Sequence, residues 1–178
     1  MAGLDKLVEF LLNIIEKLLP IFILHPYEQG IQYWCGKYLR TIGPGIWWKV
    51  PFLDTVDKDI VVTSTLTIPA QSLTTKDGRQ IVVKSMVRYN IFDIKLFLLS
   101  VTDRTDAISD TAQCIIKEQI TQRNWEACAD NQLDNIITRK LRNEIKRWGI
   151  DVEKFTITDI GLIRSIRLFN ETSNIING

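Results

Sequence analysis

The first 24 residues combine apolar and polar side chains in a helical pattern. At about 100° per residue, the polar positions fall within an arc of roughly 120°, and apolar side chains fill the rest of the helical wheel. We therefore predict an amphipathic helix that ends before Pro20, followed by a further apolar stretch, Ile21–Leu24. The polar positions are Asp5, Lys6, Glu9, Asn13, Glu16 and Lys17.

The apolar face of this predicted helix is wider than that of a helix resting on a soluble core, and is typical of a helix lying in a membrane interface. Charged residues interrupt the segment too often for a spanning helix. It also lacks a secretory cleavage site, and Ala2 stands where a myristoylation motif needs glycine. A core helix and an oligomer-packing helix stay open as alternatives. The segment's net charge of −1 argues against lipid binding, because membrane-surface helices usually have a basic polar face.

The next part of the chain, to about residue 100, has the alternation and turn signals of β-strands. Ile60–Ile68 is rich in β-branched residues and threonine, and Ile81–Ile91 alternates apolar with polar positions. Asp77-Gly78 between them is a strong turn signal. We expect two neighbouring antiparallel strands, and their core-facing side would include Ile81, Val83, Val87, Tyr89 and Ile91.

Between residues 102 and 148 the apolar positions recur with a helical period. Acidic residues gather at the start of the first helical segment and basic residues at the end of the second, which complements the helix dipoles. Gly149 is well placed to cap the second helix, and Val152–Ile163 is predicted to be a final strand. The expected fold class is α+β, an antiparallel-rich sheet with packed helices. The two apolar stripes are Ile108, Ala112, Ile115, Ile116 and Ile120, and Leu133, Ile137, Leu141, Ile145 and Trp148.

Composition and charge exclude several classes of function. The chain has 178 residues, of which 46% are hydrophobic and 24% charged, as in a single domain with a real core. A formal net charge of +1 is too small for a nucleic-acid-binding surface. One histidine, His25, and three cysteines without ligand spacing offer no metal site, and no phosphate loop or nucleophile elbow occurs. We therefore expect no catalytic, cofactor-binding or metal-binding residues.

Several short motifs follow one another along the chain. Each is unspecific alone, but together they resemble the SPFH, or Band 7, domain of stomatins, prohibitins and flotillins. The resemblance extends over about residues 25–165. The motifs are Pro26-Tyr27-Glu28-Gln29-Gly30, Gly36-Lys37-Tyr38, Gly43-Pro44-Gly45-Ile46, Pro51-Phe52-Leu53-Asp54, Thr75-Lys76-Asp77-Gly78, Val87-Arg88-Tyr89-Asn90-Ile91 and Trp148-Gly149-Ile150-Asp151-Val152.

The resemblance divides the chain into a membrane-anchoring N-terminal helix (1–24), an SPFH domain (25–165) and a short C-terminal tail (166–178). It implies a non-enzymatic, membrane-associated homo-oligomer that organises membrane microdomains or membrane protein complexes. Family members continue into a long coiled coil, for which the tail has no room. We therefore expect assembly through the domain body, the N-terminal helix or longer partners.

The main alternative is a regulator that binds a membrane protease or channel without forming large homo-oligomers. A membrane-bound protease is a weaker hypothesis, because the sequence shows no catalytic triad. The expected location is peripheral or monotopic on a membrane, on the cytoplasmic face, since three cysteines without a disulfide pattern favour a reducing compartment.

Two adjacent tryptophans follow the turn Gly43-Pro44-Gly45. An interfacial belt would hold their rings at the level of the lipid headgroups. Ordinary strand packing would instead turn neighbouring side chains to opposite faces, so that one tryptophan faces the core. The expected membrane contacts are Leu4, Leu7, Val8, Leu11, Ile14, Ile15, Leu18, Leu19, Ile21, Phe22, Trp47 and Trp48.

Overall fold

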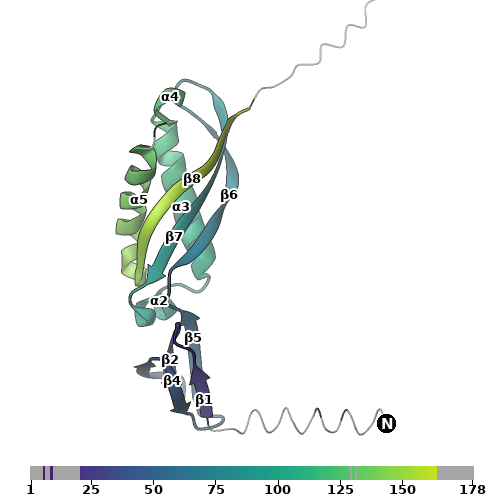
Figure 1. Ribbon diagram of the computed structural model, residues 1–178, viewed down its shortest axis with the longest axis vertical. Helices are drawn as coiled ribbons and strands as arrows, with labels where there is room; N and C mark the ends of the chain where they lie inside the picture. The colour runs from purple at the N-terminus through teal and green to yellow at the C-terminus, as the bar shows by residue number, and fades with distance from the viewer. Residues whose placement is uncertain (1–5, 7–8, 10–20, 129, 131, 164–178) are drawn as a thin grey trace, which may run out of the picture.

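The computed structural model describes residues 6, 9, 21–128, 130 and 132–163. The predicted N-terminal helix, apart from Lys6 and Glu9, and the predicted tail from residue 166 lie outside these residues. Figure 1 shows an elongated molecule, in which a small unit of strands and a larger unit of sheet and helices follow one another along the long axis. The α+β class with antiparallel sheets is confirmed.

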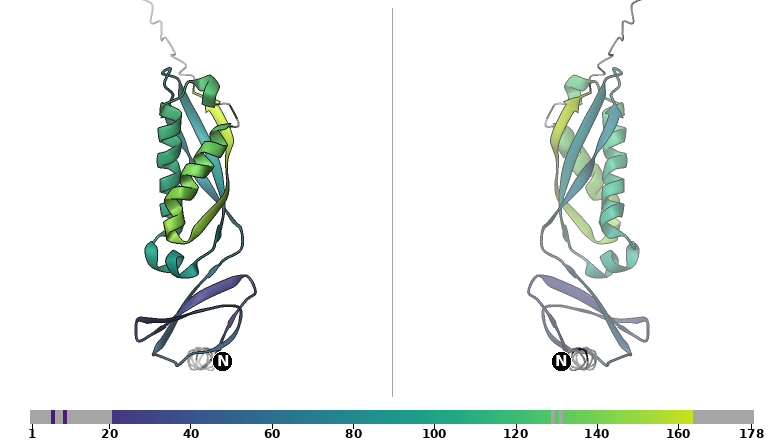
Figure 2. Two further views of the ribbon diagram at one scale, coloured as in Figure 1. Left: turned by 90° about the vertical axis from the view of Figure 1, so that its left-hand side faces the viewer. Right: turned by 90° about the vertical axis from the view of Figure 1, so that its right-hand side faces the viewer.

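The larger unit is a three-stranded antiparallel sheet in the order β6–β7–β8, with helices on one face (Figure 2). The pairing of β6 with β7 confirms the antiparallel strands predicted on either side of Asp77-Gly78. The elements of this unit are β6 (Ser64–Thr74), β7 (Gln80–Ile91), α3 (Arg104–Thr121), α4 (Trp125–Cys128), α5 (Gln132–Ile145), the short 3-10 helix η1 (Lys146–Trp148) and β8 (Ile150–Leu162).

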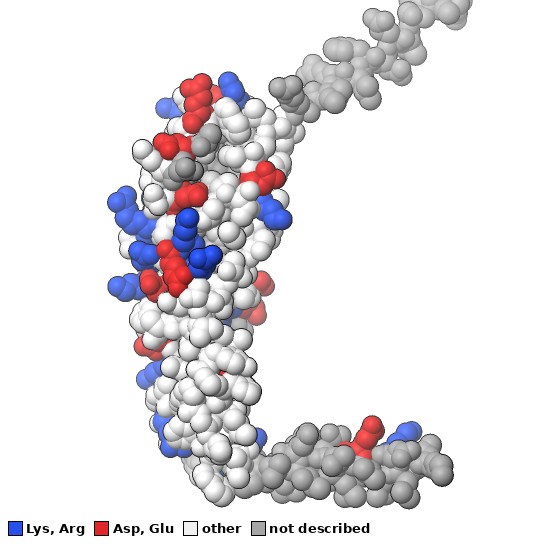
Figure 3. Space-filling model, viewed as in Figure 1, with Lys and Arg blue, Asp and Glu red and all other residues white. Residues whose placement is uncertain are grey.

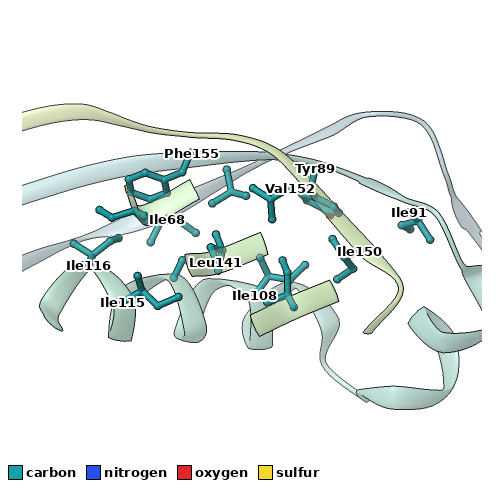
Figure 4. Close-up of a cluster of buried hydrophobic side chains, with 14 of the residues drawn as sticks. Ile68, Tyr89, Ile91, Ile108, Ile115, Ile116, Leu141, Ile150, Val152 and Phe155 are labelled. Atoms are coloured by element: carbon teal, nitrogen blue, oxygen red, sulfur yellow. The ribbon is translucent and has the colours of Figure 1, made fainter. Parts of the chain in front are cut away.

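The core lies between this sheet and helices α3 and α5, as Figure 4 shows. Alternate residues of β7 are buried on the helix side, and the intervening ones are partly or fully exposed on the other side. All positions of the two predicted helical stripes up to Ile145 are buried. Full burial of an Ile or Leu side chain contributes about 1.5–3 kcal/mol, so this layer dominates the stability of the unit.

The smaller unit has a three-stranded sheet in the order β3–β2–β5 and a two-stranded ribbon, β1–β4, and all its pairs are antiparallel. Gly30 in β2 lies so close to β5 that a Cβ there would approach the carbonyl oxygen of Asp57 to 2.7 Å. The strands are β1 (Ile21–Leu24), β2 (Glu28–Trp34), β3 (Lys37–Ile42), β4 (Gly45–Trp48) and β5 (Asp54–Ile60).

Ile21–Leu24 differs from the prediction. This segment forms β1, paired residue by residue with Gly45–Trp48, and does not simply extend the N-terminal segment. Its alternation of exposed and less exposed side chains is that of a strand whose two faces differ. Among the described residues the first strand therefore begins at Ile21, four residues before the predicted domain boundary at residue 25.

Helix α2 (Ile94–Ser100) lies where the two units meet and was not predicted from the sequence. Arg104 holds this junction together. Its Nε donates to the carbonyl oxygen of Phe97 and its Nη2 to that of Leu98, both at 3.1 Å. The same Nη2 lies 3.4 Å from Oδ2 of Asp57 in β5. One guanidinium therefore connects the end of α2, the start of α3 and the smaller unit.

Candidate membrane-contact surface

The β1–β4 ribbon has one face made of large apolar side chains. Ile21 lies opposite Trp48 in the register, and Ile23 lies opposite Ile46. Residues directly opposite one another project to the same side, so these four side chains share one face. All four are exposed, and Trp48 and Ile46 retain 68% and 69% of their accessible surface. Such a face is unusual for the surface of a soluble domain, where large apolar residues are normally scattered singly.

The side chains on the other face of the ribbon pack against the rest of the protein. Trp47 is half-buried, its Nε1 donates to the carbonyl oxygen of Gly43 at 2.8 Å, and the guanidinium of Arg40 lies 4.8 Å from its ring centroid. Phe22 lies opposite Trp47, and Leu24 on the same side is buried. The structure therefore separates the two tryptophans, with Trp48 turned to the open face and Trp47 fixed by protein contacts.

A loop after β4 adds to the apolar surface. Val50 and Leu53 are exposed, and Phe52 is 90% exposed with a left-handed backbone, φ 68°. The loop is nevertheless well tied down, because Oδ2 of Asp54 accepts from the N–H of Val50 at 2.8 Å. A strained backbone that displays a phenylalanine to solvent is typical of a functional site.

The turn between β2 and β3 lies beside this loop. The N–H of Cys35 donates to the carbonyl oxygen of Leu53 at 2.9 Å, which brings the exposed Trp34 to the same end of the molecule. We call the whole surface the apolar end. It comprises Ile21, Ile23, Trp34, Ile46, Trp48, Val50, Phe52 and Leu53. Figure 3 shows that the smaller unit carries few charged side chains in that view, whereas charges crowd the larger unit.

A cavity of about 400 Å³ lies next to the apolar end. It has lysines as well as apolar side chains in its wall. Lys58 is paired with Glu28 at 2.9 Å, whereas Lys49 has no ion pair among the described residues. A cation beside an apolar surface suits the headgroup region of an anionic membrane. The cavity is lined by Phe22, Ile23, Lys49, Asp54, Thr55, Val56 and Lys58.

Glu28 organises the strand end beside this cavity. Its carboxylate accepts from the N–H of His25 and from Nζ of Lys58, both at 2.9 Å, and these contacts lower its pKa. His25 stacks on Tyr27 with 5.4 Å between the ring centroids. The motif Pro26-Tyr27-Glu28-Gln29-Gly30 thus shapes the entry into β2.

Of the predicted membrane contacts, Ile21 and Trp48 lie at the apolar end, and Phe22 and Trp47 lie on the opposite face of the ribbon. The predicted contacts from Leu4 to Leu19 lie outside the described residues. Sequence reasoning did not single out the exposed loop residues, although Pro51-Phe52-Leu53-Asp54 was recognised as a motif. The available signal was the apolar run Val50–Leu53, which follows the tryptophan pair after a single lysine.

The described part of the chain contains no helix long and apolar enough to cross a membrane. Among the same residues, no group of three or more His, Cys, Asp or Glu side chains is arranged to hold a metal ion.

The sequence pattern that defines the SPFH domain / Band 7 family matches residues 22–167, so this chain belongs to that family. It is 28% identical to an uncharacterized protein of Methanocaldococcus jannaschii over 142 residues, 79% of this chain and 71% of the relative. It is 27% identical to stomatin of Mus musculus over 146 residues, 80% of this chain and 51% of stomatin. It is 23% identical to mechanosensory protein 2 of Caenorhabditis elegans over 163 residues, 89% of this chain and 34% of that protein.

Proposed function

We propose that this protein is a non-enzymatic scaffold that lies on a membrane with its apolar end and assembles with copies of itself. The exposed apolar face of the β1–β4 ribbon, which continues into the strained loop at Phe52, is the observation that carries the proposal. Apolar side chains from three separate segments gather at one end of the molecule, while the larger unit carries most of the charge. A lipid surface would bury this end without a specific partner.

The order of the two elements in the sequence supports the same proposal. Ile21 is the first residue of β1 and lies opposite Trp48, so the strand that follows the predicted amphipathic helix in the sequence begins on the exposed face. Trp48 has the amphipathic ring that favours the headgroup level, and Lys49 follows it directly. Two adjacent membrane contacts would hold the domain more firmly than either one alone.

Assembly would strengthen the contact further. A single apolar end of this size gives weak and reversible binding, but copies in one oligomer bind as a unit, and their contributions add through effective concentration. Such an assembly would organise membrane microdomains or membrane protein complexes. Its location would be the cytoplasmic face of a membrane, because Cys35 and Cys114 are exposed free thiols, as is usual in a reducing compartment.

Liposome flotation tests the proposal. We would compare the full chain with a variant that begins at Ile21, since a later start would remove β1. In both backgrounds the double change Ile46→Ser/Trp48→Ser should lower the bound fraction, by about tenfold in the shorter chain, because two apolar side chains lose their burial in lipid. Leu99→Ser is the matched control, since Leu99 is an exposed leucine on α2 and outside the apolar end.

If the short chain does not float and the serine changes have no effect in the full chain, the apolar end is not a lipid contact. It would then serve a protein partner, as the alternative of a regulator of a membrane protease or channel requires. If the Leu99 control loses as much binding as the Trp48 variant, the loss reflects damage to the fold and the proposed surface is wrong.

A further inference from the structure

The sheet β6–β7–β8 has helices on one face and nothing on the other among the described elements, as the right-hand view of Figure 2 shows. The uncovered face carries mainly threonine and charged residues, with Val82 and Met86 half-buried between them. Some of its charged residues lie opposite a residue of the other sign on the neighbouring strand. Lys84, for example, lies opposite Asp159 in the register.

One pair on this face is not balanced. Arg88 of β7 lies directly opposite Lys154 of β8, and both side chains are exposed. Neither takes part in any ion pair found among the described residues. Like charges directly opposite each other destabilise a sheet. A hollow of about 170 Å³ lies between them, lined by Met86, Arg88, Lys154 and Thr156. An acidic side chain from outside would relieve the repulsion.

The opposite side of the same unit offers the complementary charge. Helix α3 buries Ile108, Ala112, Ile115 and Ile116 against the sheet, so its other side faces away from it. That outer side begins with an exposed acidic row, and none of its members is in an ion pair within the described residues. The spacing places them on one side of the helix. The acidic row is Asp103, Asp106 and Asp110.

The two charged surfaces also lie toward the same end of the unit. Strand β7 ends at Ile91, just before α2, and α3 begins at Arg104, just after it. Arg88 is therefore close to the α2 end of the sheet, and the acidic row occupies the first turns of α3 at that same end. Further along the helix the outer side carries a basic residue, Lys117, so the acidic surface is limited to the first turns of α3.

We infer that copies of this chain pack head to tail, with the acidic row of α3 in one copy against the Arg88–Lys154 pair of the next. The inference rests on the proposed scaffold function and names the interface through which the scaffold assembles. The carboxylates of the acidic row would gain charge-assisted hydrogen bonds from these two cations. Because the two surfaces are on opposite sides of one unit, the contact is heterologous and repeats from copy to copy, giving a ring or an open filament. Two cationic sheet faces would repel each other, which disfavours a two-fold dimer here.

Charge reversal in the full chain tests the pairing, with assembly size measured by sedimentation velocity in mild detergent. The wild type should form large species at low salt and smaller ones at about 1 M salt, where the screening length is only about 3 Å. Arg88→Glu/Lys154→Glu and Asp106→Lys/Asp110→Lys should each weaken self-association by at least about tenfold. Combining the two changes should restore it, since the charges then match again. Lys76→Glu is the control, because Lys76 is exposed in the turn between β6 and β7, at the other end of the sheet, and should leave assembly unchanged.

Cross-linking distinguishes head-to-tail packing from a two-fold dimer. Cys114 is an exposed thiol one turn beyond Asp110 on α3, and Cys128 is buried. In a Cys35→Ser background, Thr156→Cys adds one thiol beside the hollow, and mild oxidation should then give a ladder of dimers, trimers and longer species. The same background without Thr156→Cys should stay monomeric on a denaturing gel.

The outcomes separate the inference from the function on which it depends. Two results would refute the head-to-tail interface but not the proposed scaffold function. These are disulfide-linked dimers that form through Cys114 alone, and large species whose size the charge reversals do not change. If the full chain is monomeric at low salt, both in detergent and on liposomes, the proposed scaffold function is refuted, and the proposed interface is refuted with it. If urea unfolding shows that a double reversal does not fold, the single variants Lys154→Gln and Asp110→Asn replace it, and each should still weaken assembly.

Discussion

The carbonyl oxygen of Asp93 lies where a side chain at Gly149 would have to start, since a Cβ at that position would approach it to 2.2 Å. Gly149 also has a left-handed backbone, φ 77°, and its own carbonyl oxygen accepts from the N–H groups of Phe92 and Asp93. Gly149→Ala should therefore lower the free energy of unfolding by about 3 kcal/mol or more, through backbone strain and the clash with α2. Urea unfolding of the purified variant measures this loss.

Gly78→Ala is the control for that prediction. Gly78 has φ 79°, but a Cβ there meets no atom within 4 Å. Only the left-handed backbone penalty remains, so the loss should be about 1 kcal/mol. Equal losses for the two variants would show that the close approach to Asp93 is unimportant.

The two neighbouring isoleucines of α5 should respond very differently to truncation. Ile137 is fully buried between α5 and the sheet, whereas Ile136 is partly exposed. Ile137→Ala should cost about 2–5 kcal/mol, because it removes buried apolar contacts and leaves a cavity. Ile136→Ala should cost much less, and an equally large loss there would contradict the orientation of α5. Thermal and urea unfolding both report the difference.

Arg104 should contribute more to the free energy of unfolding than its carboxylate partner, Asp57. Arg104→Ala removes two hydrogen bonds to carbonyl oxygens at the end of α2, worth about 2 kcal/mol together. Asp57→Ala breaks only a partly exposed ion pair, which contributes less than about 1 kcal/mol. Arg104→Lys should lie close to the alanine variant, because a single ammonium cannot reach Phe97 and Leu98 in the same geometry. A larger loss from Asp57→Ala than from Arg104→Ala would refute this reasoning, with urea midpoints as the measurement.

The ionisation of Asp77 should make the free energy of unfolding depend on pH. Its Oδ1 accepts from Oγ1 of Thr75 at 2.6 Å and from the N–H of Trp125, and Arg79 lies 3.0 Å from Oδ2. The hydrogen bond from Thr75 is the main cause that lowers the pKa of Asp77 in the folded chain. The unfolded carboxyl, with a pKa near 3.9, takes up its proton first as the pH falls. The stabilisation is therefore complete above that value and is lost as the pH falls through the lower, folded pKa.

Asp77→Asn measures that contribution directly. The difference in urea midpoint between wild type and variant should be largest near neutral pH and should shrink toward about pH 3. Glu28 and Glu118, whose pKa values are also lowered, are present in both proteins and leave the difference unchanged. A difference that stays constant with pH would show that the charge of Asp77 is not what stabilises the turn.

The larger unit was the more predictable part of the fold. The alternation in Ile81–Ile91 and the stripes of α3 and α5 arise because one face of each element is buried, and periodicity reports that directly. Helix α2 was missed because its seven residues are too short to show a helical period. The run Ile60–Ile68 was divided between two strands, since Ile60 ends β5 and Ser64 begins β6.

The candidate site was only partly predictable. Sequence marked Trp47 and Trp48 as a pair, and strand geometry required that they face opposite ways, but only the register with β1 decides which one is exposed. Ile21–Leu24 was read as part of the preceding apolar segment because a four-residue strand has no distinctive periodicity. The exposure of Phe52 depends on a left-handed turn that no local residue pattern requires.

The short β1–β4 ribbon also determines how the domain would respond to force. β1 begins at Ile21, and all four of its residues pair with β4. A force on residue 20 along the axis of β1 would shear the ribbon and load all of these backbone pairs at once. A force at right angles to that axis would instead separate the pairs one after another, beginning at Ile21. The same tension on the N-terminal segment would therefore be resisted in one direction and yield in the other. A domain pulled through residue 20 would respond to the direction of the force as well as to its size.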